Sequence, residues 1–239
     1  TDTVTVAPDL TTGTAFVTYY EDGSRDFIFH MIGTAADHVR FEPDMLPAGE
    51  LILNVSASSL GSPPLRAAIL AAADAVRARG GRVACDPNAR PELMRDEGAR
   101  TALERIVATS AWLMPSTSDL DYLFPGIGEE AAVERLLASS AEIVALKRGA
   151  EGATVVGRGE RHDLAPHRVE EVDPTGAGDA FCGTFVALLA QGASLAAAGR
   201  LANAAGAIAV TRRGPMEGNS SPAEIAEFLA ARPADEAKG

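Results

Sequence analysis

Residues 51–90 read LILNVSASSLGSPPLRAAILAAADAVRARGGRVACDPNAR, and this stretch decides the fold. It contains two short apolar runs, residues 51–55 and 82–85, of the kind that forms buried parallel strands. Between them, Ser62 can cap the start of a helix, and the pair Gly80-Gly81 can stop it. A strand, a helix and a strand in this order predict a βαβ unit with parallel strands and a right-handed crossover.

The same alternation continues downstream. Strands that alternate with helices predict an α/β fold, here a doubly wound, mostly parallel sheet with flanking helices. An antiparallel edge is expected late in the sheet, where a glycine hairpin separates two strand-forming runs. The further elements that we expect are strands at residues 111–114, 142–146 and 154–156, a hairpin through 157–159, and helices at 99–109, 129–138, 178–190, 195–210 and 222–231.

The N-terminal segment has a different pattern. Residues 14–20 and 25–30 are rich in strand-forming side chains, and Asp22-Gly23 lies between them, which is a strong hairpin signal. We therefore expect a small antiparallel β ribbon that stands apart from the sheet. The predicted organisation is a β lid at residues 12–36 and an α/β domain formed by residues 1–11 and 37–239.

Composition narrows the class of protein. Of the 239 residues, 46% are hydrophobic and 23% are charged, which excludes a disordered or fibrous chain. Only two cysteines, Cys85 and Cys182, are present, so a disulfide-stapled scaffold is excluded and a reducing cytoplasm is favoured. The net charge of −12 disfavours nucleic-acid binding, and no apolar run reaches the roughly 18 residues of a membrane span. We expect a cytoplasmic protein.

One loop carries the clearest chemical signal. In an open α/β sheet, ligands bind outside the carboxyl ends of the strands, and Asp173-Pro-Thr-Gly-Ala-Gly-Asp179 is expected at that edge. Gly176 and Gly178 allow a tight turn at the start of an apolar helix, which makes a ready anion site. A carboxylate beside that site, Asp179, suits the deprotonation of a hydroxyl that attacks a phosphoryl group. The alternative is a glycine turn in which Asp179 only caps the helix.

Both glycines should matter for this loop. A β-branched side chain at Gly178 would crowd the backbone amides of the anion site, and it would oppose a positive φ if the turn requires one there. We therefore expect Gly178→Val to damage the anion site more than the fold.

These motifs resemble those of a known family. Residues 173–181, DPTGAGDAF, resemble the C-terminal signature of the ribokinase-like, or phosphofructokinase-B, carbohydrate kinases. Residues 86–94 resemble a stretch of the fructokinase and 2-keto-3-deoxygluconate kinase branches. The other matching stretches are residues 146–152 (nucleotide loop), 202–214 (adenine pocket), and 12–17 with 22–27 (lid ribbon).

The resemblance implies an ATP-dependent sugar kinase of ribokinase-like fold that uses Mg²⁺. Asp179 matches the catalytic base, and the backbone of Gly176, Ala177 and Gly178 matches the anion hole for the transferring phosphate. The ribbon matches a lid that closes over the sugar. Because the exposed strands of the ribbon offer edges for pairing, a homodimer through the lid is the alternative role of the ribbon.

The resemblance also assigns residues to the nucleotide. Gly149 and Gly152 match positions beside the nucleotide, and Asn203 matches a residue near the adenine. Ser116 begins the stretch Ser116-Thr-Ser-Asp119, which lies where the family often has Asn-x-x-Glu near the phosphates and magnesium. Both ends of that motif are altered here.

Two carboxylates are candidate metal ligands. Asp119 keeps the carboxylate of the altered motif, one methylene shorter, so the resemblance implies a water-mediated role near Mg²⁺. Asp173 and Thr175 match a loop that holds a monovalent cation such as K⁺ in some members. The four histidines show no metal-ligand spacing.

The acceptor is less well defined. Arg90, beside Asn88 in the Asp86-Pro-Asn-Ala-Arg90 loop, suits a sugar acid such as 2-keto-3-deoxygluconate, although it could be a surface arginine. The acid-specific branch usually has tyrosine and arginine on the lid, where this chain has His30 and Met31. That difference favours a neutral ketose with His30 near the sugar.

Other interpretations stay open at this point. The family begins with a strand and a Gly-Gly-x-x-x-Asn-type motif that grips the sugar, and none precedes Thr1, so we expect that the N-terminal portion of the domain is lacking. A kinase for a nucleoside or a vitamin precursor, and a non-catalytic nucleotide- or sugar-binding homologue, are the alternatives. A Rossmann-type dehydrogenase is disfavoured because no G-x-G-x-x-G follows the first strand.

Overall fold

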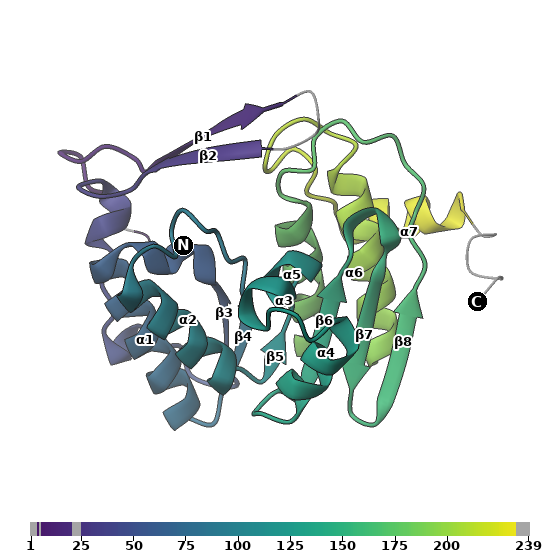
Figure 1. Cartoon of the computed structure of the whole chain (residues 1–239), viewed down its shortest axis with the longest axis horizontal. Helices are drawn as coiled ribbons and strands as arrows, with labels where there is room; N and C mark the ends of the chain where they lie inside the picture. The colour runs from purple at the N-terminus through teal and green to yellow at the C-terminus, as the bar shows by residue number, and fades with distance from the viewer. Residues whose placement is uncertain (1–3, 5, 21–24, 233–239) are drawn as a thin grey trace.

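The computed structural model describes residue 4 and residues 6–20 and 25–232 (Figure 1). Its main sheet has six strands in chain order, β3-β4-β5-β6-β7-β8. The first four strands run parallel, and the last two run antiparallel to their neighbours. The strands are β3 (Ile52–Ser56), β4 (Arg82–Asp86), β5 (Trp112–Leu113), β6 (Ile143–Lys147), β7 (Ala153–Gly157) and β8 (Glu160–Leu164).

Helices cover both faces of this sheet, as Figure 1 shows. The crossover helices between the parallel strands all lie on one face, because right-handed crossovers between strands in chain order stay on one side. The opposite face is covered by helices that follow the last strand. The first group is α1 (Pro63–Ala78), α2 (Glu97–Thr109), α3 (Thr117–Leu123) and α4 (Glu129–Leu137), and the second is α5 (Ala177–Ala190) and α6 (Leu195–Ala209), with α7 (Pro222–Ala230) packed on α6.

The pleat of the strands divides the core into two layers. In β4, Val83 and Cys85 pack in the core beneath α1 and α2, whereas Ala84 packs with Trp112 in the core beneath α5 and α6. Successive side chains of a strand point to opposite faces, so a strand buried on both faces is apolar throughout. The predicted α/β fold with a mostly parallel sheet and flanking helices is confirmed.

The predicted ribbon is also present. Strands β1 (Thr14–Tyr19) and β2 (Arg25–His30) pair antiparallel with Thr14 opposite His30. The Asp22-Gly23 turn lies outside the described residues. In Figure 1 the ribbon crosses above the edge where the parallel strands have their carboxyl ends. The segment that follows the ribbon is attached to the α/β domain, because the Ser62 hydroxyl at the start of α1 donates a hydrogen bond to the Asp37 carboxylate of this segment.

One helix was not predicted. This helix is α3, which begins at Thr117, shortly after the strand expected at residues 111–114. Its signal is a capping box, in which the Ser116 side chain accepts from the Asp119 N–H and the Asp119 carboxylate accepts from the Ser116 N–H. Among the described residues, no helix has both the length and the apolar character to span a membrane.

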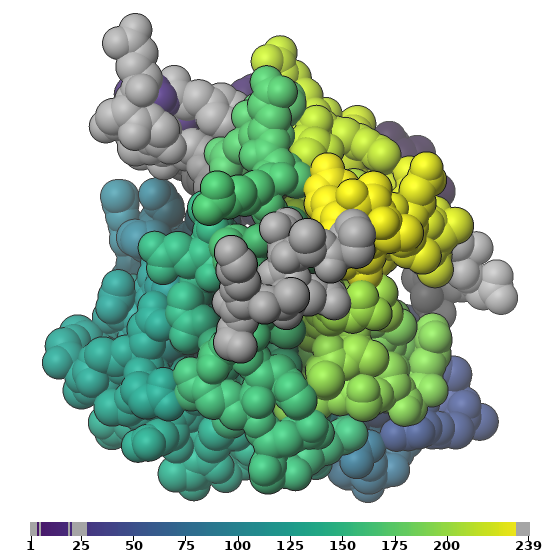
Figure 2. All heavy atoms as spheres, turned by 90° about the vertical axis from the view of Figure 1, so that its right-hand side faces the viewer, coloured from purple at the N-terminus to yellow at the C-terminus, as the bar shows by residue number. Residues whose placement is uncertain are grey.

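Helix α7 lies on the outside of the molecule against α6 (Figure 2). Its first turn depends on Glu224, which accepts hydrogen bonds from the Ser221 N–H and hydroxyl at 2.8 and 2.9 Å. Arg212, which follows α6, pairs with the same carboxylate at 3.1 Å. These donors, the Ser221 N–H first, lower the pKa of Glu224 from 4.5 to about 2.

We predict that the first turn of α7 loosens in acid. Because the pKa of Glu224 is lowered in the folded protein, its stabilisation is present above pH 4.5 and is lost as the pH falls towards about 2. Amide hydrogen exchange in α7 should accelerate across that range in the wild type. The Glu224→Gln variant should exchange faster at neutral pH with a weaker pH dependence, whereas the control Glu227→Gln should behave as wild type. Identical exchange profiles for both variants would contradict the assignment.

Candidate active site

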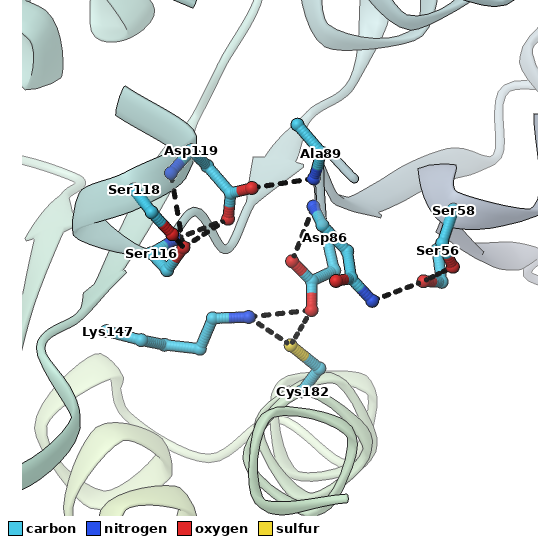
Figure 3. A network of polar contacts seen from close by, with 10 residues as sticks. Ser56, Ser58, Asp86, Ala89, Ser116, Ser118, Asp119, Lys147 and Cys182 are labelled. Atoms are coloured by element: carbon cyan, nitrogen blue, oxygen red, sulfur yellow. Dashed lines mark hydrogen bonds and ion pairs between the residues drawn. The ribbon is translucent and has the colours of Figure 1, made fainter. Parts of the chain in front are cut away.

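Polar side chains from four loops meet at the carboxyl edge of the sheet (Figure 3). The Asn88 amide donates to the Ser56 hydroxyl at 3.2 Å, which joins the loops after β4 and β3. The Ala89 N–H donates to Asp119 at 2.8 Å, which joins the loop after β4 to the start of α3. These loops therefore lie together at one edge of the sheet.

A buried ion pair lies at the centre of this network. The Lys147 ammonium, at the end of β6, contacts the Asp86 carboxylate, at the end of β4, at 2.6 Å. The side chains are only 13% and 7% exposed. The Cys182 thiol of α5 completes the cluster at 3.4 Å from both partners. Figure 3 shows the three side chains pointing toward one another above the end of α5.

Strand geometry explains why these residues meet. Asp86 has the orientation of Ala84, and Lys147 that of Ala145, so both point to the face covered by α5. Burial raises the pKa of Asp86, and the adjacent Lys147 ammonium opposes that rise. Burial opposes the charge of Lys147, but the Asp86 carboxylate, which contacts the ammonium at 2.6 Å, outweighs burial, so the pKa of Lys147 is raised above its ordinary value. Lys147 therefore stays protonated at neutral pH.

The sequence reading missed this cluster as a chemical unit. The structure buries both cysteines as free thiols. However, Cys182 also contacts an ion pair, and burial raises its pKa strongly, which keeps it a thiol. The available signal was a charged residue at the end of each of two apolar strands, Asp86 and Lys147.

Asp119 is a buried carboxylate that braces two loops. It is 3% exposed, and its oxygens accept from the Ala89 N–H and from the Ser116 N–H and hydroxyl at 2.6 to 2.8 Å. These contacts fix the loop after β4 against α3. The metal role of Asp119 and the nucleotide role of Ser116 stay predictions.

Gly176 shapes the loop at the start of α5. It has φ +84°, and an added Cβ would collide with the carbonyl oxygen of Pro215. Gly178 lies within the first turn of α5, and its φ is not positive. A Cβ at this position would lie 3.7 Å from the Lys147 ammonium. The turn does not require a positive φ at Gly178, because Gly176, two residues earlier, makes it.

The N-terminus of α5 is open to a ligand. Helices α1, α2 and α6 begin with a serine or aspartate side chain that accepts from the first turn, whereas no side chain caps α5 at Gly176. Uncapped first-turn N–H groups and the helix dipole together favour an anion. Asp179, in the same turn, is exposed, and no described residue donates to its carboxylate. A free carboxylate beside an anion site can accept a proton from a hydroxyl group.

Asp173 ties this loop to the segment after α6. Its side chain is buried, and its oxygens accept from the Thr175 N–H at 2.9 Å and from the Gly214 N–H at 3.0 Å. These two hydrogen bonds hold Gly176 in close contact with Pro215. A monovalent cation at Asp173 and Thr175 stays a prediction, and no group of three candidate metal ligands occurs among the described residues.

Two of the residues assigned to the nucleotide, Gly152 and Asn203, lie at the end of β8. Gly149 and Gly152 both have positive φ, at +57° and +86°, and a Cβ on Gly152 would collide with the Leu164 carbonyl oxygen. The Asn203 amide donates to the Ala165 carbonyl at 2.9 Å. Gly152 and Asn203 thus hold neighbouring residues of one segment, and their contact with a nucleotide stays a prediction.

The acceptor residues lie on two different elements. Asn88 adopts φ +35°, and its N–H donates to Asp86 at 3.2 Å, which turns the loop that carries half-buried Arg90. His30 is exposed at the end of β2 on the ribbon. Their contact with a sugar stays a prediction.

Comparison with known proteins gives a consistent result. Residues 1–222 match the family described as pfkB family carbohydrate kinase. A fructokinase of Klebsiella pneumoniae is 32% identical over 216 residues, which cover 86% of this chain and 69% of the relative.

Solved structures extend the likeness to three dimensions. A candidate ribokinase II of E. coli, in complex with ATP and Mg²⁺, has a TM-score of 0.84 and 38% identity over 94% of this chain and 72% of its own. A fructokinase of Vibrio cholerae, bound to fructose, ADP and a calcium ion, has a TM-score of 0.76 and 25% identity over 90% and 73%. Its double mutant was solved with fructose, ADP and a potassium ion.

We predict opposite tolerances at the two glycines of the loop. Gly176→Ala should destabilise the protein by more than about 2 kcal/mol, because a side chain at this φ costs roughly 1–3 kcal/mol and would also meet Pro215. Gly178→Ala should change the stability by less than about 1 kcal/mol, because the site has room and alanine favours a helix. Urea unfolding measures both. Equal losses would contradict this account of the turn.

Proposed function

The chain belongs to the pfkB family of carbohydrate kinases, and from that premise we propose that it transfers the γ-phosphoryl group of ATP to a hydroxyl group of a ketose. As a family member it is a phosphotransferase. The observation that carries the finer proposal is the exposed Asp179 carboxylate, which lies in the first turn of an uncapped helix. That arrangement puts a proton acceptor beside an anion site.

The residues present fit a phosphate group. No side chain caps α5, so the N–H groups of Gly178 and Asp179 can face an anion, and Gly176 leaves the approach free of a side chain. The Ala177 N–H makes a long hydrogen bond of 3.4 Å to the Pro174 carbonyl, which a bound anion would have to replace. Bound Mg²⁺ would offset charge on the phosphates, and it usually keeps several waters, so it needs few protein ligands. Asp119 is the candidate for a water-mediated contact, and Asp173 with Thr175 is the candidate for a monovalent cation.

Each residue then has a distinct task. Asp179 orients the acceptor hydroxyl and takes its proton. The first-turn amides of α5 stabilise the negative charge that grows on the transferred group. Gly149, Gly152 and Asn203 shape the segment that would receive the nucleotide. The task of the fold is to hold the hydroxyl and the phosphate in line.

The ribbon is proposed as a lid over this edge. Phe16 and Ile28, which are partners across β1 and β2, are 62% and 68% exposed. An exposed apolar pair on a projecting ribbon suits the exclusion of water from a bound sugar. The same surface would equally suit a second copy of the chain.

A ketose is the favoured acceptor class. The fructokinase of Klebsiella pneumoniae and the fructose-bound enzyme of Vibrio cholerae support it. A keto-sugar acid is the second candidate, because half-buried Arg90 lies on the loop that Asp86 and Asp119 hold at this edge. An arginine there could pair with a sugar carboxylate.

We predict that Asp179→Asn abolishes most turnover. Loss of a general base lowers the rate by roughly 10²–10⁴. The affinity for an ATP analogue should stay within about tenfold, because the amides are unchanged. Coupled detection of ADP with fructose measures the rate, and calorimetry measures the affinity.

The matched control for this test is Glu104→Gln, an exposed carboxylate on α2 at the outer face. It should retain wild-type turnover. A near-normal rate for Asp179→Asn would remove Asp179 from the proposed role. Binding of the nucleotide by the wild type without transfer to any acceptor would favour a non-catalytic homologue, and transfer only to a nucleoside or vitamin precursor would reassign the acceptor.

We predict that Arg90→Ala distinguishes the two acceptor classes. A charge-assisted hydrogen bond contributes about 1.5–3 kcal/mol, so kcat/KM for a keto-sugar acid should fall by roughly 10- to 150-fold. For fructose or another neutral ketose the loss should be only a few-fold. Measured kcat/KM values for both substrates, in wild type and variant, decide between them. An equal loss on both would show that Arg90 supports the loop without reading a charge.

A further inference from the structure

We propose that the Asp86–Lys147 ion pair is a positioning element that fixes the acceptor loop, residues 86–90, against the phosphate loop, residues 176–179. This inference rests on the proposed function, because it assumes that a hydroxyl and a phosphate must be held in line between the two loops. Asp86 begins the acceptor loop, and the Lys147 ammonium lies 3.7 Å from the position of a Cβ on Gly178 in the phosphate loop. The two partners come from different strands.

Asp86 holds the acceptor side. One carboxylate oxygen accepts from the Asn88 N–H at 3.2 Å, and the other accepts from Lys147 at 2.6 Å. The Asn88 backbone is thereby kept in a left-handed turn at φ +35°. On the opposite side of the loop, the Asp119 carboxylate accepts a hydrogen bond from the next backbone N–H, that of Ala89, at 2.8 Å. Two carboxylates therefore contact the acceptor loop, and Asp86 links it to Lys147 on the phosphate side.

Lys147 holds the phosphate side. Its ammonium contacts the Cys182 sulfur of α5 at 3.4 Å, and it lies 3.7 Å from the position of a Cβ on Gly178. Two of its three N–H donors thus have partners in Asp86 and Cys182. Because Lys147 packs under the first two turns of α5, it determines the distance between the N-terminus of this helix and the sheet.

The chemistry of the pair favours a role in geometry over a role in stability. Apolar residues of similar volume often replace a buried ion pair without loss of stability, so burial of two charges is weak grounds for a stabilising function. A short ionic contact, in contrast, defines the distance between two loops closely. A misplacement of about 1 Å between reacting groups can cost roughly 100-fold in rate.

The test is a double variant, Asp86→Asn with Lys147→Met, which removes both charges and leaves none buried alone. We expect kcat with the preferred acceptor to fall about 100-fold. The affinity for an ATP analogue should stay within about threefold, and the midpoint of thermal unfolding should stay close to wild type. Amide hydrogen exchange at Asn88 and Ala89 should rise, which is a readout independent of turnover.

Two further variants complete the design. The control Asp74→Asn with Arg105→Met removes an exposed ion pair between α1 and α2, and it should leave kcat unchanged. The single variant Asp86→Asn keeps an oxygen for the Asn88 N–H and serves if the double variant does not fold. It should lower kcat at least tenfold, with nucleotide affinity again within threefold.

The outcomes separate the two proposals. A double variant with wild-type kcat and wild-type exchange at Asn88 overturns the positioning role and leaves the kinase function intact. Equal losses of kcat, nucleotide affinity and stability also overturn it, because they indicate a general structural role. A wild-type protein that transfers phosphate to no acceptor removes the proposed function, and this inference with it.

Discussion

The parallel pairing of β3 to β6 is the constraint on which the rest of the structure depends. Parallel strands in register end at the same edge, so the residues that follow them must be neighbours. Ser56 is opposite Asp86 in the β3–β4 register, and Ser116 bridges to Lys147. Each of these polar residues comes where an apolar strand stops. The register of the strands therefore brings the site residues together. The hydrogen bonds between them then fix the positions of their side chains.

The two faces of the sheet contribute differently to that site. Helices α1 to α4 pack on one core and supply the braces, such as Asp119 at the start of α3. Helix α5 packs on the other core, and its N-terminus supplies the anion site. Close packing is possible because α6 presents small residues: a Cβ on Gly206 would lie 3.5 Å from the Ala177 carbonyl oxygen and 3.8 Å from the Phe181 Cβ. The position of the anion site thus depends on residues remote from it in sequence.

The site also departs from the rules followed elsewhere in the fold. A serine at the start of α1, α6 or α7 satisfies first-turn N–H groups, whereas α5 begins at a glycine and leaves its first turn open. A buried ion pair lies under that turn, although apolar residues would fill the space at lower electrostatic cost. Local departures of this kind are expected where binding and chemistry take precedence over stability.

Apart from α3, the sequence by itself determined the order of the main helices and strands, the parallel sheet, the ribbon and the glycine loop at residues 173–179, because apolar periodicity, caps and turn residues are local signals. It also placed Asp179 at the start of a helix. Only the tertiary structure decided which glycine makes the turn, since the strain at Gly176 comes from Pro215, about 40 residues away. Only the tertiary structure joined Asp86, Lys147 and Cys182, because no local pattern encodes the distance between ends of separate strands and a helix. Burial and close contacts arise when separate elements pack together. The order of residues along the chain does not show directly which elements pack together.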